Sequence, residues 1–160
     1  MDKYLTILID SLVKKSALLD KISDICSGHE ECLFGEKLDI DEYNRLMEEK
    51  GKLIDDLDLL DDGFTALYER VAPTLREDPS PYAEKIKKLQ ELITEVSDKT
   101  ALIQAREMRI QSRIDRLVKF GKEQSKPTAT PSDAAMKYYR TMKNTNVTSA
   151  VFVDNKRGKK

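Results

Sequence analysis

The fold is decided by residues 82–117, which read YAEKIKKLQELITEVSDKTALIQAREMRIQSRIDRL. Apolar side chains recur there at alternating steps of three and four residues, the spacing of one face of an α-helix. Only Thr100 and Glu107 interrupt this apolar seam. A helix of this length, roughly 60 Å, cannot bury its own stripe and must pack against other helices. The seam residues are Tyr82, Ile86, Leu89, Ile93, Val96, Ile103, Ile110, Ile114 and Leu117.

A second long helix is expected over residues 39–71. Asp39 followed by Glu42 is typical of a helix N-terminus, because the Asp side chain accepts free backbone N–H groups. Lys50 is the charged interruption of the seam, and Pro73 predicts a helix end close to Val71. The seam residues are Tyr43, Leu46, Leu53, Leu57, Leu60, Phe64, Leu67 and Val71.

A first helix is expected over residues 2–27, with Lys15 as the interruption of its seam. Gly28 predicts its end, since glycine is common just beyond a helix terminus. The third helix is predicted to begin with Ser80 as N-cap and Pro81 in its first position, and to end at Gly121. The seam residues of the first helix are Leu5, Leu8, Leu12, Leu19, Ile22 and Cys26.

These patterns predict an all-α fold, an antiparallel up-down-up bundle of three long helices over residues 1–121. The composition agrees, because 36% charged and 39% hydrophobic residues suit long helices with narrow apolar faces. The heptad spacing alone would also fit a parallel coiled coil between several chains. The two breaks with capping signals favour folding within one chain.

The C-terminal region is predicted to be a flexible tail. Residues 122–133 contain Pro and small polar residues and are expected to be a linker. Residues 134–160 form a basic tail, in which residues 134–143 are expected to form a short helix. Residues 122–160 hold nine Lys or Arg against three Asp or Glu, a net +6, whereas residues 1–121 hold 19 against 26, a net −7. The tail is therefore expected to fold back onto the acidic bundle or to meet a partner.

The tail also carries the predicted binding residues. Its apolar side chains can complete the surface of the bundle or become ordered on binding a client protein. The two roles coexist if the client displaces the tail, which would be autoinhibition. The predicted client-binding residues are Met136, Tyr138, Tyr139, Met142, Val151, Phe152 and Val153.

The sequence shows no phosphate-binding loop, nucleophile elbow or paired metal-binding motif, so neither an enzyme nor a cofactor is expected. Cys26, His29 and Cys32 are a candidate zinc site, but a fourth ligand would have to be a nearby Glu, and Cys26 also fits the apolar seam. The acidic body argues against nucleic-acid binding. No stretch is long and apolar enough to insert in a membrane, and no leader is recognised, so a cytoplasmic protein without disulfides is expected.

Residues 40–50, IDEYNRLMEEK, and the following Leu-Asp-rich residues 53–64 resemble flagellar type III export chaperones of the FlgN/FliT type. The shared features are a short acidic segment, a Glu-Lys pair (here Glu49 and Lys50) and a leucine-rich helix between a first helix and a long third one. Residues 134–142 and the Val-Phe-Val-Asp-Asn-Lys stretch at 151–156 are similar to tails of Gram-positive members.

The resemblance implies a cytoplasmic chaperone without enzymatic activity, which binds unassembled flagellar axial proteins and keeps them soluble for export. Hook–filament junction proteins are the expected clients of the FlgN branch, and the filament cap or flagellin those of related branches. The export apparatus is a further expected partner, and the chaperone would be a monomer or homodimer. The alternative prediction is a self-associating coiled-coil scaffold or adaptor without an export role.

Overall fold

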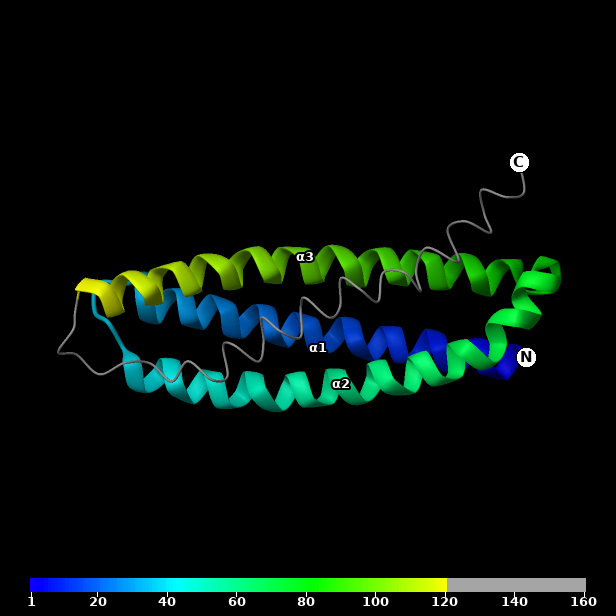
Figure 1. Cartoon of the computed structure of the whole chain (residues 1–160), viewed down its shortest axis with the longest axis horizontal. Helices are drawn as coiled ribbons and strands as arrows, with labels where there is room; N and C mark the ends of the chain where they lie inside the picture. Colours follow the sequence, from blue (N-terminus) through cyan, green and yellow to red (C-terminus); the bar gives the residue numbers. More distant parts are fainter. Residues whose placement is uncertain (121–160) are drawn as a thin grey trace.

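The computed structural model describes residues 1–120, which form a bundle of three long helices (Figure 1). Helix α1 spans Asp2–Phe34, α2 spans Ile40–Glu77 and α3 spans Ala83–Phe120, with a single 3-10 turn, η1, at Ser80–Tyr82. The chain runs up, down and up again, so α1 and α3 are parallel to each other and antiparallel to α2. The predicted all-α bundle is confirmed, and residues 1–120 contain no strand. The predicted linker, tail and short helix lie outside the described residues.

Helix α1 is the central element of the bundle. It packs along both α2 and α3, whereas the backbones of α2 and α3 approach each other at few points. The seams predicted from the sequence supply most of the buried side chains. The largest apolar side chains that are fully buried are Tyr43, Leu5, Leu8, Leu19, Ile22, Leu33, Met47, Leu57 and Leu75.

The predicted end of the first helix was wrong. Helix α1 continues through Gly28 to Phe34, and the N–H of Gly35 donates to the carbonyl oxygen of Glu31. A Cβ added at Gly28 would lie 2.7 Å from Cδ1 of Leu46 on α2. The glycine therefore permits close approach of α1 and α2, and buried residues beyond it extend the helix by two turns.

The predicted end of the second helix was also wrong. Pro73 lies inside α2, which continues to Glu77 although Pro73 can donate no backbone hydrogen bond. Ala72 and Leu75, on either side of it, are buried. Burial of these side chains offsets the lost hydrogen bond, so the helix ends six residues, nearly two turns, beyond the predicted end at Val71.

The predicted helix starts were closer to the structure. Asp39 is the N-cap of α2, and its side chain accepts a hydrogen bond of 3.0 Å from the N–H of Glu42. Ser80 and Pro81 form the 3-10 turn that leads into α3 instead of its first α-helical turn, and the N–H of Ser80 donates to Asp78 Oδ1. The predicted end at Gly121 lies outside the described residues.

Two of the charged interruptions of the seams, Lys50 and Glu107, meet inside the bundle. Lys50 Nζ lies 2.8 and 2.9 Å from the two carboxylate oxygens of Glu107, and their side chains are 1% and 0% exposed. Cys26 Sγ donates to the same carboxylate over 3.1 Å, so all three helices share this contact. Lys15 pairs with Asp61, and Thr100 donates to the carbonyl oxygen of Val96. Each interruption of a seam therefore has a polar partner.

Removing one partner of the buried Lys50–Glu107 pair should destabilise the bundle. We expect Lys50→Met or Glu107→Leu alone to lower the free energy of unfolding by about 3–5 kcal/mol, because each leaves an uncompensated buried charge. The double variant should recover most of this loss, since both charges are then gone. Urea denaturation followed by circular dichroism measures the three values. Additive losses in the double variant would contradict the pairing.

The glycines of α1 and α2 provide a second test of packing. A Cβ added at Gly51 would meet no atom within 4 Å, so Gly51→Ala should stabilise the protein by about 0.5–1 kcal/mol through helix propensity. Gly28→Ala should give a smaller gain or a loss, because Leu46 must move. Thermal denaturation of both variants checks this order. Equal gains would show that Gly28 does not limit the approach of the helices.

Candidate functional site

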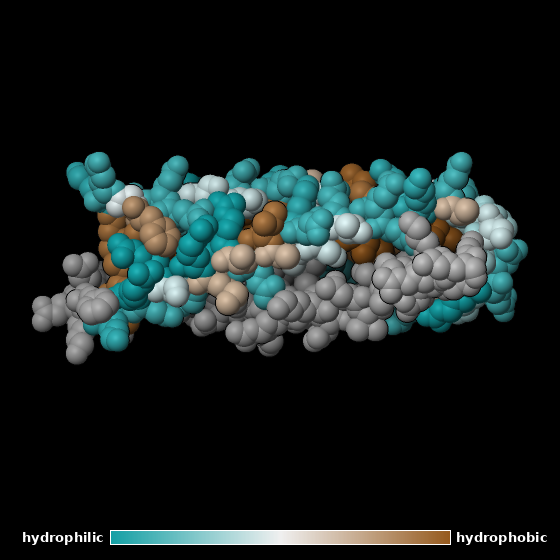
Figure 2. Space-filling view, turned by 90° about the horizontal axis from the view of Figure 1, so that it is seen from above, coloured by the Kyte–Doolittle hydropathy of each residue, from teal (hydrophilic) through white to brown (hydrophobic). Residues whose placement is uncertain are grey.

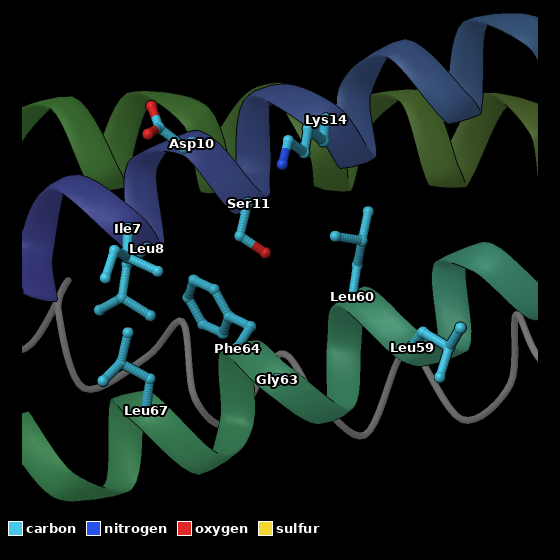
Figure 3. A pocket seen from close by; sticks show the side chains of 10 residues that line it. All are labelled: Ile7, Leu8, Asp10, Ser11, Lys14, Leu59, Leu60, Gly63, Phe64 and Leu67. Atoms are coloured by element: carbon cyan, nitrogen blue, oxygen red, sulfur yellow. The ribbon is translucent and has the colours of Figure 1, made fainter.

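An apolar groove lies between the first half of α1 and the middle of α2, with a volume of about 360 Å³. Figure 3 shows Phe64 and Leu67 of α2 pointing toward Ile7 and Leu8 of α1. The polar side chains at the groove all come from α1. The residues that line the apolar groove are Ile7, Leu8, Asp10, Ser11, Lys14, Leu59, Leu60, Gly63, Phe64 and Leu67.

The groove exists because α2 buries no side chain fully between Leu57 and Tyr68. Leu60, Phe64 and Leu67 were predicted as seam residues, but all three are only partly buried. Gly63 contributes no side chain, and the space beside it is open to at least 4 Å. Over nearly three turns, α2 therefore presents apolar side chains that the bundle covers only in part.

Two apolar residues at the groove are markedly exposed. Leu59 is 71% exposed and Ile7 is 47% exposed. Single exposed apolar residues are common on protein surfaces, and on the face shown in Figure 2 apolar patches are small and separated by hydrophilic side chains. Leu59 and Ile7 both line a concave apolar surface. This combination suits binding of another apolar segment.

Helix α2 also carries an acidic run beside the groove, made of five aspartates. Asp61 pairs with Lys15 of α1. Asp58 has its pKa raised above the usual value by partial burial and by the charges of Asp61, Asp55 and Asp62. The other four members form no ion pair with residues 1–120. The acidic run consists of Asp55, Asp56, Asp58, Asp61 and Asp62.

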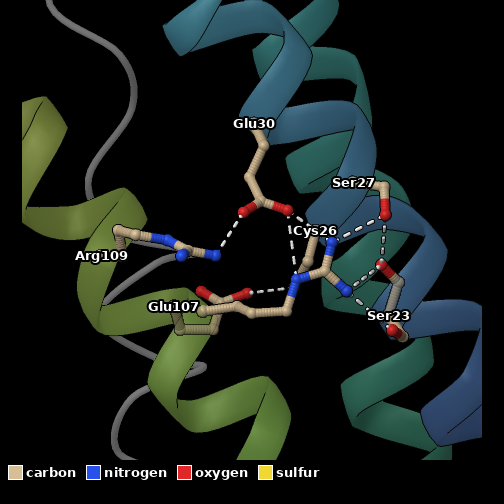
Figure 4. A network of polar contacts seen from close by, with 7 residues as sticks. Ser23, Cys26, Ser27, Glu30, Glu107 and Arg109 are labelled. Carbon is tan, nitrogen blue, oxygen red and sulfur yellow. Dashed lines mark hydrogen bonds and ion pairs between the residues drawn. The ribbon is translucent and has the colours of Figure 1, made fainter.

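A second polar network joins α1 to α3 (Figure 4). Arg106 donates to Glu30, Ser23 and Ser27, and Arg109 donates to Glu30 over 2.7 Å. Burial by itself raises the pKa of Glu30, but the hydrogen bonds and charges of the two arginines hold that pKa below its usual value. The carboxylate of Glu30 therefore accepts hydrogen bonds from both arginines, and its role is structural.

The candidate zinc residues do not form a metal site in the described part of the chain. Cys26 donates to Glu107, and its pKa is raised by burial, by the charge of Glu107 and by that hydrogen bond. The ring of His29 packs against Tyr43 of α2, with ring centroids 4.4 Å apart. Cys32 is also buried. No three His, Cys, Asp or Glu side chains of residues 1–120 are grouped so that they could hold a metal ion.

His29 is buried as a neutral ring. Burial and the charge of Lys50 lower its pKa from 6.5 to about 3. A hydrogen bond with the backbone of Tyr43 acts in the opposite direction but does not offset these two effects. The ring therefore serves as an aromatic spacer between α1 and α2 and does not act as an acid or base at neutral pH.

The predicted client-binding residues Met136, Tyr138, Tyr139, Met142, Val151, Phe152 and Val153 all lie outside the described residues. Sequence reasoning missed Leu59, which falls outside the seam, and did not foresee that Leu60, Phe64 and Leu67 line a groove. The available signal for the groove was the pair of adjacent leucines, Leu59 and Leu60, which lie four and three residues before Gly63.

No protein-family model matches the chain, and no match was found among the curated proteins or the solved structures. None of the helices within residues 1–120 combines the length and apolar character needed to cross a bilayer.

The low pKa of the buried His29 ring predicts that the protein loses stability in mild acid. Because its folded pKa is about 3 and its unfolded pKa about 6.5, the unfolded chain binds the extra proton between these values. Stability should therefore fall as pH drops below 6.5, by up to about 1.4 kcal/mol per unit. Urea denaturation at pH 7 and pH 5 measures it, since most carboxyl groups stay ionised over that range.

The matched variant is His29→Phe, which keeps an aromatic ring beside Tyr43 but cannot titrate. Its free energy of unfolding should change less between pH 7 and pH 5 than that of the original chain. The comparison uses the change in the free energy of unfolding with pH. A variant that is equally more or less stable at both pH values therefore does not affect it. Equal slopes in the two proteins would rule out His29 as the cause.

Proposed function

We propose that the chain is a cytoplasmic flagellar export chaperone, which binds unassembled axial subunits and has no catalytic activity. The observation that supports this best is the apolar groove between α1 and α2, with Ile7 and Leu59 exposed beside it. The resemblance of residues 40–64 to FlgN/FliT-type chaperones supplies the biological context.

The groove suits an amphipathic helix from a client. Such a helix places apolar side chains at steps of three and four residues on one face, and a hydrophobic groove between two helices accepts that face. The contact would hide an apolar stripe that otherwise drives early polymerisation of the subunit. The clients in this proposal are hook–filament junction proteins, the filament cap or flagellin, and the export apparatus is a further partner.

The competing proposal is a self-associating coiled-coil scaffold. In the structure the apolar seams pack within one chain, as at Leu19 and Ile22 of α1 and Leu57 of α2, all fully buried. Seams already used in this way are not free for a parallel coiled coil between chains, which favours the chaperone. Sedimentation measures the difference: a stable oligomer without free monomer would favour the scaffold.

A substitution in the groove tests the chaperone proposal. Leu59→Asp places a charge on its rim, so the tagged full-length variant should capture about tenfold less axial subunit from a flagellated host than the original chain. Met108→Asp is the control, because Met108 is 58% exposed on α3, against 71% for Leu59 on α2, and does not line the apolar groove. Quantitative mass spectrometry of the captured proteins gives the readout.

The two variants separate binding from folding. Both place the same charge at an exposed apolar residue within a helix, but Asp at position 59 also joins the acidic run, so urea denaturation of each variant is compared with its capture. Equal capture of axial subunits by both variants would show that the groove is not the client site. Absence of flagellar proteins from the pull-down with the original chain would overturn the proposed function itself.

A further inference from the structure

A second groove lies between α1 and the middle of α3, with a volume of about 490 Å³. We call it the basic groove. It is lined by α1 near Leu19 and Ser23 and by α3 from Lys99 to Arg109, and it shares no residue with the apolar groove. We propose that the basic groove binds an acidic amphipathic helix of a partner protein, at a site separate from the one that the proposed function uses.

The basic groove offers apolar surface to such a helix. Leu19 and Ile103 line it and are 0% and 2% exposed, whereas Leu102 lines it and is 68% exposed. Ala105 lies three residues beyond Leu102, so the two share one face of α3. An exposed leucine at the edge of a concave surface is a contact that a partner's apolar side chain can bury.

The exposed charges of α3 beside this groove are all positive. Lys99, Arg106 and Arg109 line the groove, and Arg113 follows one turn farther along the helix. The one acid among residues 99–114 is Glu107, which is 1% exposed and forms the buried pair described above. These four cations, here called the basic row, extend over about 21 Å of α3.

Glu30 of α1 is the carboxylate that two members of the basic row share (Figure 4). Arg106 is held by Glu30 and by two serines of α1. Arg109 is 61% exposed, and within residues 1–120 it donates through Nη2 alone. The other N–H groups of Arg109 can therefore donate to a carboxylate of a partner.

The two ends of the basic row also keep capacity for an acidic partner. Lys99 pairs with Asp20, whose side chain is 63% exposed, and such exposed pairs contribute little to stability. Arg113 donates to the carbonyl oxygen of Leu33 and forms no ion pair with a carboxylate of residues 1–120. The four cations of the row thus face two paired carboxylates of α1, which leaves a net charge of +2.

An acidic amphipathic helix matches both the apolar surface and the charge. Its apolar side chains, at steps of three and four residues, would cover Leu102 and the buried side chains beneath it. Asp or Glu side chains on the flanks of that stripe would face the basic row, and such complementary charges favour the correct partner. About 15 residues of helix have the length of the basic row.

The same features disfavour other occupants of the basic groove. A basic segment, such as residues 156–160 of this chain, would meet like charges there. Helix α2 of a second copy is acidic and exposes Leu59, but the residues three and four positions from Leu59 are three aspartates and a glycine. A second copy would therefore supply one leucine and no apolar stripe.

The bundle thus carries two grooves with opposite charges beside them. The apolar groove adjoins the acidic run of α2, whereas the basic groove adjoins the basic row of α3. Because the two grooves share no residue and favour partners of opposite charge, the chain can hold two different partners at once. This inference concerns the basic groove alone and does not depend on the proposed function.

A synthetic peptide tests the site. The probe is a fluorescent helical peptide of about 15 residues, with leucines at steps of three and four residues and glutamates on both flanks of the leucine stripe. Fluorescence anisotropy measures its binding to the full-length chain. We expect saturable binding, about tenfold tighter than that of a peptide of the same composition whose leucines are spread around the helix. Equal binding of the two peptides would mean attraction by charge alone and would overturn the proposal.

A pair of variants on α3 locates the apolar contact. Leu102→Asp should weaken binding of the stripe peptide about tenfold, because it places a carboxylate against the leucines and glutamates of the peptide. Met108→Asp adds the same charge to the same helix at a residue that is 58% exposed and does not line the basic groove. Binding by the Met108 variant should change less than about twofold. Equal losses in the two variants would place the peptide elsewhere.

A second pair tests the charge of the groove. Arg109→Gln should weaken binding about threefold and reduce its dependence on salt, and Arg106 still holds Glu30 in this variant. Lys87→Gln is the control, because it removes an exposed cation of α3 about 33 Å from Arg109 and should leave the affinity unchanged. Urea denaturation of both variants checks that the fold is retained. Equal affinities of the two variants would contradict the assigned charge contact.

Sedimentation without peptide distinguishes a partner from a second copy. We expect the Leu59→Asp and Leu102→Asp variants to sediment like the original chain. An oligomer of the original chain that both substitutions dissociate would make α2 of a second copy the occupant and would overturn the proposal. The peptide measurements need no axial subunit, so specific binding without captured flagellar proteins would support this site and remove the chaperone proposal. Captured axial subunits without specific peptide binding would do the reverse.

Discussion

The burial of Lys50 against Glu107 constrains the arrangement of all three helices. Either group alone would be a buried charge without a counter-ion, so α2 and α3 must align to bring both together. Sliding one helix by a single turn moves a side chain about 5.4 Å and breaks the contact. Cys26 of α1 donates to the same carboxylate. We infer that this contact fixes the register, which a uniform heptad seam would leave open.

The sequence predicted the three helices and their seams because period and length need no tertiary information. It marked Lys50 and Glu107 as interruptions, but pairing them requires the relative shift of two helices. The ends at Gly28 and Pro73 were wrong for a related reason. A Gly or Pro inside a helix costs roughly 1–3 kcal/mol of stability. Burial of residues farther along the helix, such as Leu33 and Leu75, outweighs this cost.

The groove could not be predicted from the seam pattern. Leu60, Phe64 and Leu67 obey the same spacing as buried Leu57 and Val71, and the pattern does not tell which part of a seam a neighbouring helix covers. That depends on how closely α1 and α2 run at each level. The candidate metal residues show a second limit of sequence reasoning. The spacing places Cys26 and His29 on one helix, but the packing of the three helices gives each residue a different neighbour.

The positions of the buried contacts explain why the groove lies in the middle of α2. On one side of it, Lys50 and Leu57 anchor α2, and on the other Tyr68 and the residues up to Leu75 are buried again. Between them the ion pair of Lys15 with Asp61 ties α2 to α1, a contact through a long side chain that does not require close backbone approach. Because both ends are anchored independently, the bundle can keep an apolar groove open without relying on an occupant for its folding.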